Sequence, residues 1–78
     1  MNKKEFDDMK DQYISEALAV AYNALNEKGY NAIAQLSDFL FTDDPAYITT
    51  LNNARSLLMA IDREELMQHI LRGYFNNR

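Results

Sequence analysis

His69 is the only histidine of the 78-residue chain, and it lies four residues after Glu65. On a helix this spacing places an imidazole and a carboxylate on one face, which makes a fragment of a metal or acid–base site. Two ligands do not complete such a site, and a solvent-facing helical pair explains the spacing better. The sequence has no glycine-rich phosphate loop, nucleophile elbow or metal-spaced cluster. We therefore predict a non-enzymatic protein that needs no metal or cofactor.

The stretch TDDPAYITTLNNAR, residues 42–55, is the second candidate site. Side chains of the adjacent Asp43 and Asp44 point apart, so they do not form a catalytic carboxylate pair. Asp44 suits a helix cap and Pro45 the first helical position. We predict a structural turn whose carboxylates form an ion pair with Arg55. The only threonines of the chain are its possible phospho-acceptors: Thr42, Thr49 and Thr50.

Composition restricts the class of protein. The formal net charge of −4 disfavours binding to nucleic-acid backbones, which attract mainly cations. A small helix-turn-helix-like module spanning residues 33–58 is the alternative function, but its candidate recognition helix offers only Arg55 as a cation. The N-terminus lacks the apolar region of a signal peptide, and no apolar run is long enough to span a bilayer. The sequence predicts a cytoplasmic protein without membrane insertion.

Size and residue types favour self-association. A single domain of this length has a small core, and small proteins often add a disulfide, a metal or a partner subunit. The chain has no cysteine and one histidine, so a disulfide and a structural zinc site are both excluded. Its aromatic residues exceed what a small helical core hides, and tyrosines favour interfaces. We predict a homodimer with these candidate interface residues: Tyr13, Tyr22, Tyr30, Phe39, Phe41, Tyr47, Tyr74 and Phe75.

Periodicity predicts helices throughout. Ile14, Leu18, Ala21 and Leu25 form one stripe of a helix over residues 11–28, which Gly29 ends in a left-handed cap. Residues 1–10 are predicted to be a mobile tail, or a turn that orders only against a partner. A second helix runs from the cap at Asn31 through residue 41.

The second half of the chain predicts two further helices. Residues 45–48 form a short turn followed by a helix over 50–61, or else 45–61 is one continuous helix. Asp62 and Glu65 form a capping box for the last helix. Residues 76–78 are expected to fray. The apolar side of this helix is predicted to be buried through Leu66, Met67, Ile70, Leu71 and Tyr74.

The predicted fold is therefore all-α: a compact bundle of four to five short helices within residues 11–75. The dimer would be intertwined or side by side.

Short motifs in a fixed order carry a resemblance to a known family. The chain reads EKGYN at 27–31, Gln35, DPAYI at 44–48, AR at 54–55 and REEL at 63–66. In this order and spacing it resembles the IreB family of small proteins from low-GC Gram-positive bacteria. The resemblance implies an all-helical homodimer that negatively regulates cephalosporin resistance as a substrate of a transmembrane Ser/Thr kinase.

The chain also departs from the family pattern. The resemblance implies modification on threonines in the N-terminal tail, as in a member of the family, whereas the first serine or threonine here is Ser15. Asp38 and Asp43 stand where the family has glycine. The departures predict a divergent member in which the tail does not receive the phosphate.

Overall fold

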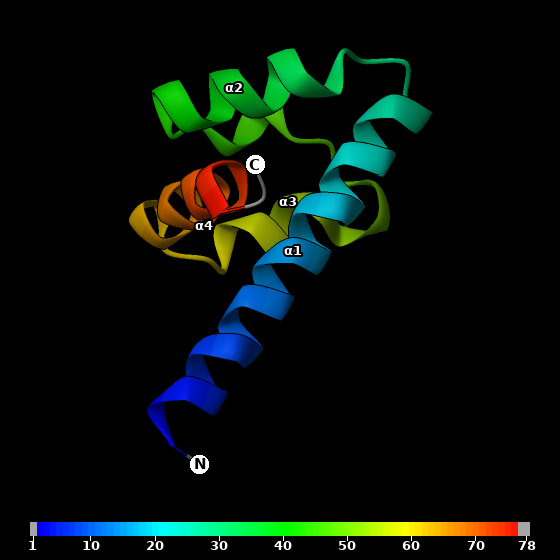
Figure 1. Ribbon diagram of the computed structural model, residues 1–78. Helices are drawn as coiled ribbons and strands as arrows, with labels where there is room; N and C mark the ends of the chain where they lie inside the picture. The colour runs from blue at the N-terminus through cyan, green and yellow to red at the C-terminus, as the bar shows by residue number, and fades with distance from the viewer. Residues whose placement is uncertain (1, 77–78) are drawn as a thin grey trace.

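The computed structural model describes residues 2–76, and within them every regular element is helical (Figure 1). The all-α prediction is confirmed. Two short 3₁₀ turns, η1 and η2, separate the second and third α-helices. The elements are α1 Lys3–Glu27, α2 Ala32–Thr42, η1 Pro45–Tyr47, η2 Leu51–Asn53, α3 Ala54–Met59 and α4 Arg63–Asn76.

Helix α1 begins eight residues earlier than predicted, so the assignment of residues 3–10 to a tail outside the helical domain is wrong. The Asn2 side chain caps the helix by accepting from the Glu5 backbone N–H at 2.9 Å. The sequence NKKE thus carries an asparagine N-cap whose Nδ2 also donates to Glu5 Oε1 at 3.5 Å, a signal hidden within a strongly polar segment. These first turns extend below the rest of the molecule in Figure 1.

The core forms where α1 crosses α2 and α3. Three alanines of α1, Ala17, Ala21 and Ala24, are buried, and their small side chains allow the other helices to approach closely. Three members of the predicted stripe are buried, whereas Leu18 is half-buried. The full buried set is Ile14, Ala17, Ala21, Ala24, Leu25, Ala32, Phe39, Ile48, Ala54, Leu58 and Leu66.

The turn between α1 and α2 is a Schellman motif. Gly29 has a φ of 85°, and its N–H donates to the Asn26 carbonyl at 3.0 Å. The Tyr30 N–H donates to the Leu25 carbonyl, also at 3.0 Å. Both bonds satisfy carbonyls that the helix leaves open, and they confirm Gly29 as the cap. The Asn31 side chain then caps α2 through the Ala34 N–H at 3.0 Å, as predicted.

We expect Gly29→Ala to destabilise the fold, because an alanine at a φ of 85° is strained although nothing lies within 4 Å of the new Cβ. A cost of about 1–2 kcal/mol would lower Tm by roughly 4–8 °C or more. Gly73→Ala is the matched control: it lies inside α4 with the same open space, and should be stabilising. Thermal unfolding by circular dichroism distinguishes the two, and equal shifts would contradict the cap assignment.

Residues 45–61 do not form the long helix predicted for either 50–61 or 45–61. Asn52 and Asn53 adopt left-handed conformations with φ of 56° and 62°, which interrupts the helical path. Asparagine tolerates this region better than most residues. The continuous apolar register therefore spans two 3₁₀ turns and a six-residue helix, α3.

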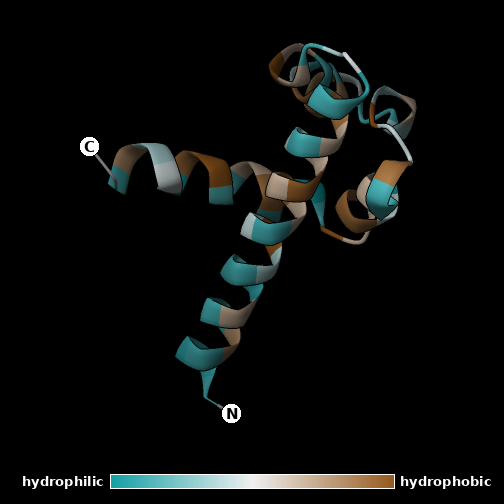
Figure 2. Cartoon of the chain, turned by 90° about the vertical axis from the view of Figure 1, so that its right-hand side faces the viewer, coloured by the Kyte–Doolittle hydropathy of each residue, from teal (hydrophilic) through white to brown (hydrophobic). Residues whose placement is uncertain are grey.

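Helix α4 extends away from α1 at a steep angle (Figure 2). Asp62 caps it as predicted, with its carboxylate accepting from the Glu65 N–H at 3.2 Å. The predicted burial of its apolar side is wrong for the single chain, because Leu66 is its only buried residue within Arg63–Asn76. Asn76 is helical, and the rest of the predicted frayed end lies outside the described residues.

Candidate protein-interaction surface

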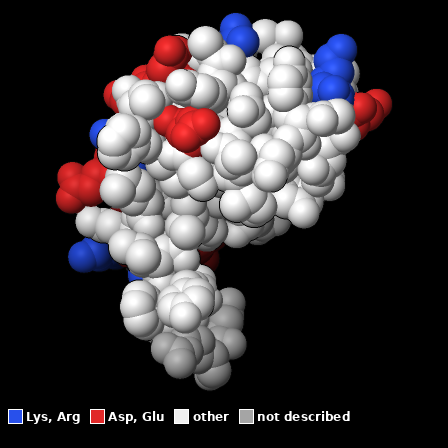
Figure 3. Space-filling view, turned by 90° about the horizontal axis from the view of Figure 1, so that it is seen from above, with Lys and Arg blue, Asp and Glu red and all other residues white. Residues whose placement is uncertain are grey.

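The apolar surface left open by this fold is extensive and is concentrated on α4 and the first half of α1. Helix α4 exposes Leu71 by 54%, Tyr74 by 61% and Phe75 by 63%, with Met67 and Ile70 beside them. The first half of α1 exposes Phe6 and Met9. The face drawn in Figure 3, which is seen from above Figure 1, carries its charged side chains mainly toward the margins, and its white area includes uncharged polar as well as apolar residues. A stable monomer rarely exposes this much apolar surface, which usually marks an interaction site.

The predicted interface residues divide into two groups. Phe39 is 6% exposed and belongs to the core, so its assignment to an interface is wrong. Tyr47 is half-buried and packs against the core. The remaining candidates are exposed at the surface: Tyr13, Tyr22, Tyr30, Phe41, Tyr74 and Phe75.

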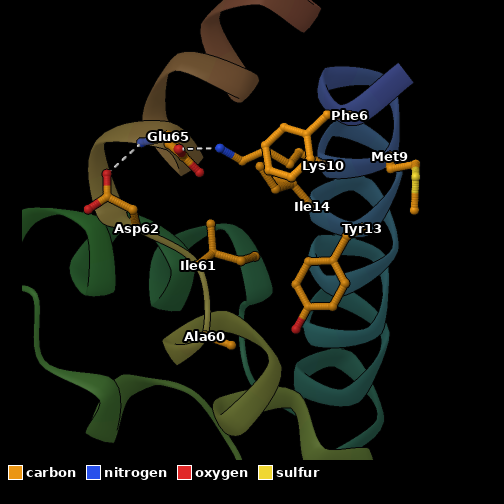
Figure 4. Close-up of a pocket in the computed structure, with 9 residues that line it drawn as sticks. All are labelled: Phe6, Met9, Lys10, Tyr13, Ile14, Ala60, Ile61, Asp62 and Glu65. Atoms are coloured by element: carbon orange, nitrogen blue, oxygen red, sulfur yellow. Dashed lines mark hydrogen bonds and ion pairs between the residues drawn. The ribbon is translucent and has the colours of Figure 1, made fainter. Parts of the chain in front are cut away.

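A pocket of about 380 Å³ lies between the first half of α1 and the α3–α4 junction (Figure 4). Phe6, Tyr13 and Ile14 form one wall, and Ile61 faces them from the other. Lys10 closes the rim through its Nζ, 2.5 Å from Glu65 Oε1. This contact raises the pKa of Lys10. The ion pair with Lys10 also engages the Glu65 carboxylate, which the sequence analysis predicted to take part in the capping box with Asp62.

A polar cluster beside this pocket joins α1 to α4. His69 Nδ1 lies 3.2 Å from Asp11 Oδ1, and its Nε2 lies 3.1 Å from Ser15 Oγ. Arg72 Nη2 contacts the same Asp11 oxygen at 3.4 Å. The partners of His69 are therefore on α1, and not the Glu65 that the sequence spacing suggested. Asp11 and Ser15 lie one helical turn apart, but nothing local in the sequence indicates which helix they face.

The order serine–histidine–aspartate resembles an acyl-transfer triad, but the surroundings do not support that chemistry. Ser15 lies inside α1, where backbone N–H groups are engaged in the helix and provide no oxyanion hole. The cluster therefore acts as a polar link between two helices.

The link is expected to make stability depend on pH. The hydrogen bond from His69, with help from Arg72, holds the pKa of Asp11 below its ordinary value of 3.8. A lowered folded-state pKa stabilises the fold above the unfolded-state value, and this stabilisation is lost as the pH falls through the folded-state value. The Asp11 side chain is 49% exposed, so solvent screening limits the contribution to less than about 1 kcal/mol.

We expect Asp11→Asn to lower Tm by a few degrees at about pH 6 and to have a clearly smaller effect at about pH 2, where the carboxyl becomes protonated in both states. Asp8→Asn is the control, because Asp8 lies on the same exposed helical segment but outside the link to α4. Calorimetry of both variants at the two pH values provides the measurement. An Asp11→Asn effect of equal size at both would show that the carboxylate charge is not responsible.

The acidic turn is structural, but the predicted ion pair has a different cation. Asp44 caps η1 by accepting from the Ala46 N–H at 2.9 Å, with Pro45 at the first position. Asp43 ends α2 with a φ of 58° and lies 4.0 Å from Arg63 Nε. Arg63 also donates to the Leu40 carbonyl. The predicted pairing of Arg55 with this turn is wrong, because Arg55 Nε donates to the Ile48 carbonyl at 2.9 Å.

The threonines differ in their hydrogen bonding. The Thr42 hydroxyl donates to the Asp38 carbonyl at 2.7 Å. Thr49 Oγ1 accepts from the Leu51 N–H at 3.2 Å. Thr50 is exposed and precedes η2, with no capping hydrogen bond from its side chain. Thr42 and Thr50 are both exposed, but of the two only the Thr50 hydroxyl makes no hydrogen bond with another described residue.

Metal-binding and membrane-spanning features are both absent from the described part of the chain. Within residues 2–76, no group of three or more metal-binding side chains is assembled. No helix in the same range has the length and apolar character needed to cross a membrane.

Comparison with known proteins identifies the family. The chain matches the IreB regulatory phosphoprotein family over residues 2–76. It is also similar to a UPF0297 protein of Ruminiclostridium cellulolyticum, with 39% identity over 71 residues, covering 91% of this chain and 81% of that protein. The family match covers the polar N-terminal segment and every helix described above. The chain belongs to the IreB family of regulatory phosphoproteins.

Proposed function

We propose that this protein is a non-catalytic cytoplasmic regulator that acts as a homodimer through protein–protein contacts. The observation that carries the proposal is the exposure of α4. This helix buries only Leu66, while five of its large apolar side chains remain exposed. The membership in a family of regulatory phosphoproteins supports a role in signalling.

The physical reason for a second copy lies in the length and position of α4. A helix of 14 residues is marginally stable in water unless its apolar face packs against another surface. The packing of α4 against α1 is limited, and the hydrogen bond from His69 to Asp11 fixes only the side of α4 that faces α1. A second copy related by a two-fold axis offers the same apolar surface, so the exposed apolar side of α4 in each protomer would be covered by the other protomer.

Light scattering on a size-exclusion column tests the homodimer. At roughly tens of micromolar we expect twice the chain mass, and Tm should rise with protein concentration because association stabilises the folded state. A monomer over the whole accessible concentration range would overturn the homodimer.

By resemblance, the regulator acts in cephalosporin resistance and cell-envelope stress signalling downstream of a Ser/Thr kinase. The segment before Ser15 has no serine or threonine, so the candidate phospho-acceptors are Thr42, Thr49 and Thr50. Thr50 is exposed and its hydroxyl is not engaged by another described residue, which supports it as the first choice.

Incubation with the cognate kinase and ATP, followed by intact-mass and fragment analysis, tests the kinase link. We expect the mass of one phosphate to be added within residues 42–50, and Thr50→Val should abolish it. A phosphate found before residue 15, or no phosphate at all, would contradict this assignment.

A further inference from the structure

We propose that the pocket between the end of α1, helix α2 and residues 46–55 binds a phosphate monoester. The proposal is independent of the homodimer, because the pocket lies at the opposite end of α1 from the apolar surface of residues 6–14. Its volume is about 320 Å³, which suits a small ligand larger than a bare phosphate ion.

The charge of the wall favours an anion. Lys28 and Arg55 both line the pocket, and no carboxylate does, although the chain has a formal net charge of −4. Asp44 lies two residues before the lining residue Ala46, and one of its carboxylate oxygens is held by the Ala46 N–H. Neither cation takes part in an ion pair with another described residue, so both charges are available to a ligand.

Arg55 is positioned for this purpose. Its Nε donates to the Ile48 carbonyl at 2.9 Å, and the residue is partly buried. Ile48 is itself fully buried, so the bond anchors the guanidinium to the core. The two Nη groups then remain as a planar pair of donors, the arrangement that binds two oxygens of a phosphate.

Hydroxyl groups supplement the cations. Thr49, Thr50, Tyr30 and Tyr47 line the same pocket. Thr49 Oγ1 accepts from the Leu51 N–H, which leaves its hydroxyl hydrogen for a ligand oxygen. A tetrahedral phosphate has three strong acceptor oxygens, whereas a carboxylate has two. Two cations with several hydroxyl donors therefore match a phosphate monoester better than a carboxylate.

The wall is held in place by a hydrogen bond between separate elements. Gln35 Nε2 on α2 donates to the Tyr47 carbonyl of η1 at 3.0 Å. The motifs EKGYN, DPAYI and AR, together with Gln35, are distant in sequence but converge here. Their members on the wall are Lys28, Tyr30, Gln35, Ala46, Tyr47 and Arg55. The fold thus brings residues of these motifs to one cationic pocket.

Nuclear magnetic resonance titration of the full chain with inorganic phosphate, O-phosphothreonine and adenosine monophosphate tests the proposal. We expect saturable shifts of the backbone amides of residues 28–30 and 46–55, with a dissociation constant on the order of 1 mM. Tighter binding of phosphothreonine would indicate a phosphorylated side chain as the source. Tighter binding of adenosine monophosphate would indicate that the natural phosphate monoester is a nucleotide. Sodium chloride at matched ionic strength controls for screening.

Two variants and one control complete the test. Arg55→Gln and Lys28→Gln should each weaken binding by about tenfold or more, because each removes a charged donor. Lys28 is exposed at the end of α1, so its variant tests the site without disturbing the core. Arg63→Gln, which removes a cation outside the pocket, should leave the affinity unchanged. The proposal is overturned if no probe gives saturable shifts, or if Lys28→Gln and Arg63→Gln bind alike.

Discussion

Leu58→Ala is expected to cost about 3 kcal/mol of unfolding free energy, because the truncated side chain leaves a cavity in the core. Leu58 is 1% exposed and belongs to α3, which packs on the alanine face of α1. A domain of this size has a net stability of only about 3–5 kcal/mol from its core. With a urea dependence of roughly 1 kcal/mol per molar, the unfolding midpoint should fall by about 3 M.

Met59→Ala provides the matched control for this experiment. Met59 is the next residue of the same helix and is 59% exposed. Its truncation should change the free energy by less than about 1 kcal/mol. Urea unfolding of the natural chain and both variants at one fixed protein concentration keeps the mass-action contribution of association comparable among them. A similar loss in both variants would show that Leu58 is not the packed side of α3.

Leu71→Asp combined with Phe75→Asp is expected to convert the proposed homodimer to a monomer. Both side chains are more than half exposed on α4 in the single chain, so the folded protomer should tolerate the change. In a covered apolar interface, each unpaired carboxylate would cost several kcal/mol of desolvation. The dimer dissociation constant should therefore rise by more than about a hundredfold.

Ile33→Asp is the control for the α4 variant. Ile33 is 64% exposed but lies in the first turn of α2, whereas the α2 residues that contact Arg63 of α4 are at the other end of that helix. Sedimentation or light scattering should find this variant as dimeric as the natural chain, and circular dichroism should show that both variants keep their helices. A dimer that survives the α4 changes but not Ile33→Asp would place the interface on α2.

Local signals made much of this fold predictable. Gly29, Asn31, Asp44 and Asp62 were assigned to caps from residue type and position alone, and each assignment is confirmed. Caps are readable because the partners lie within three or so residues of each other. The NKKE signal at the start of α1 is equally local, but the polar composition of the segment favoured a tail over a helix.

Contacts between residues that are far apart in the sequence could not be predicted from local patterns. Arg55 and Arg63 are both reasonable partners for the acidic turn, and only the fold determines that Arg63 approaches Asp43. The link from His69 to Asp11 spans 58 positions of the chain. The exposure of α4 was missed for the same reason, since periodicity identifies an apolar face but not the surface that covers it.

The first turns of α1 extend beyond the packed helices, so this end of the helix can unfold locally while the rest of the protein stays folded. Residues 3–9 are helical but exposed, so local melting of this end breaks few tertiary contacts. In a lone chain its amide hydrogens should exchange with solvent far faster than those near Ala21 and Ala24, which are fully buried. Slow exchange around Phe6 and Met9 would then reveal directly that another surface packs on this end.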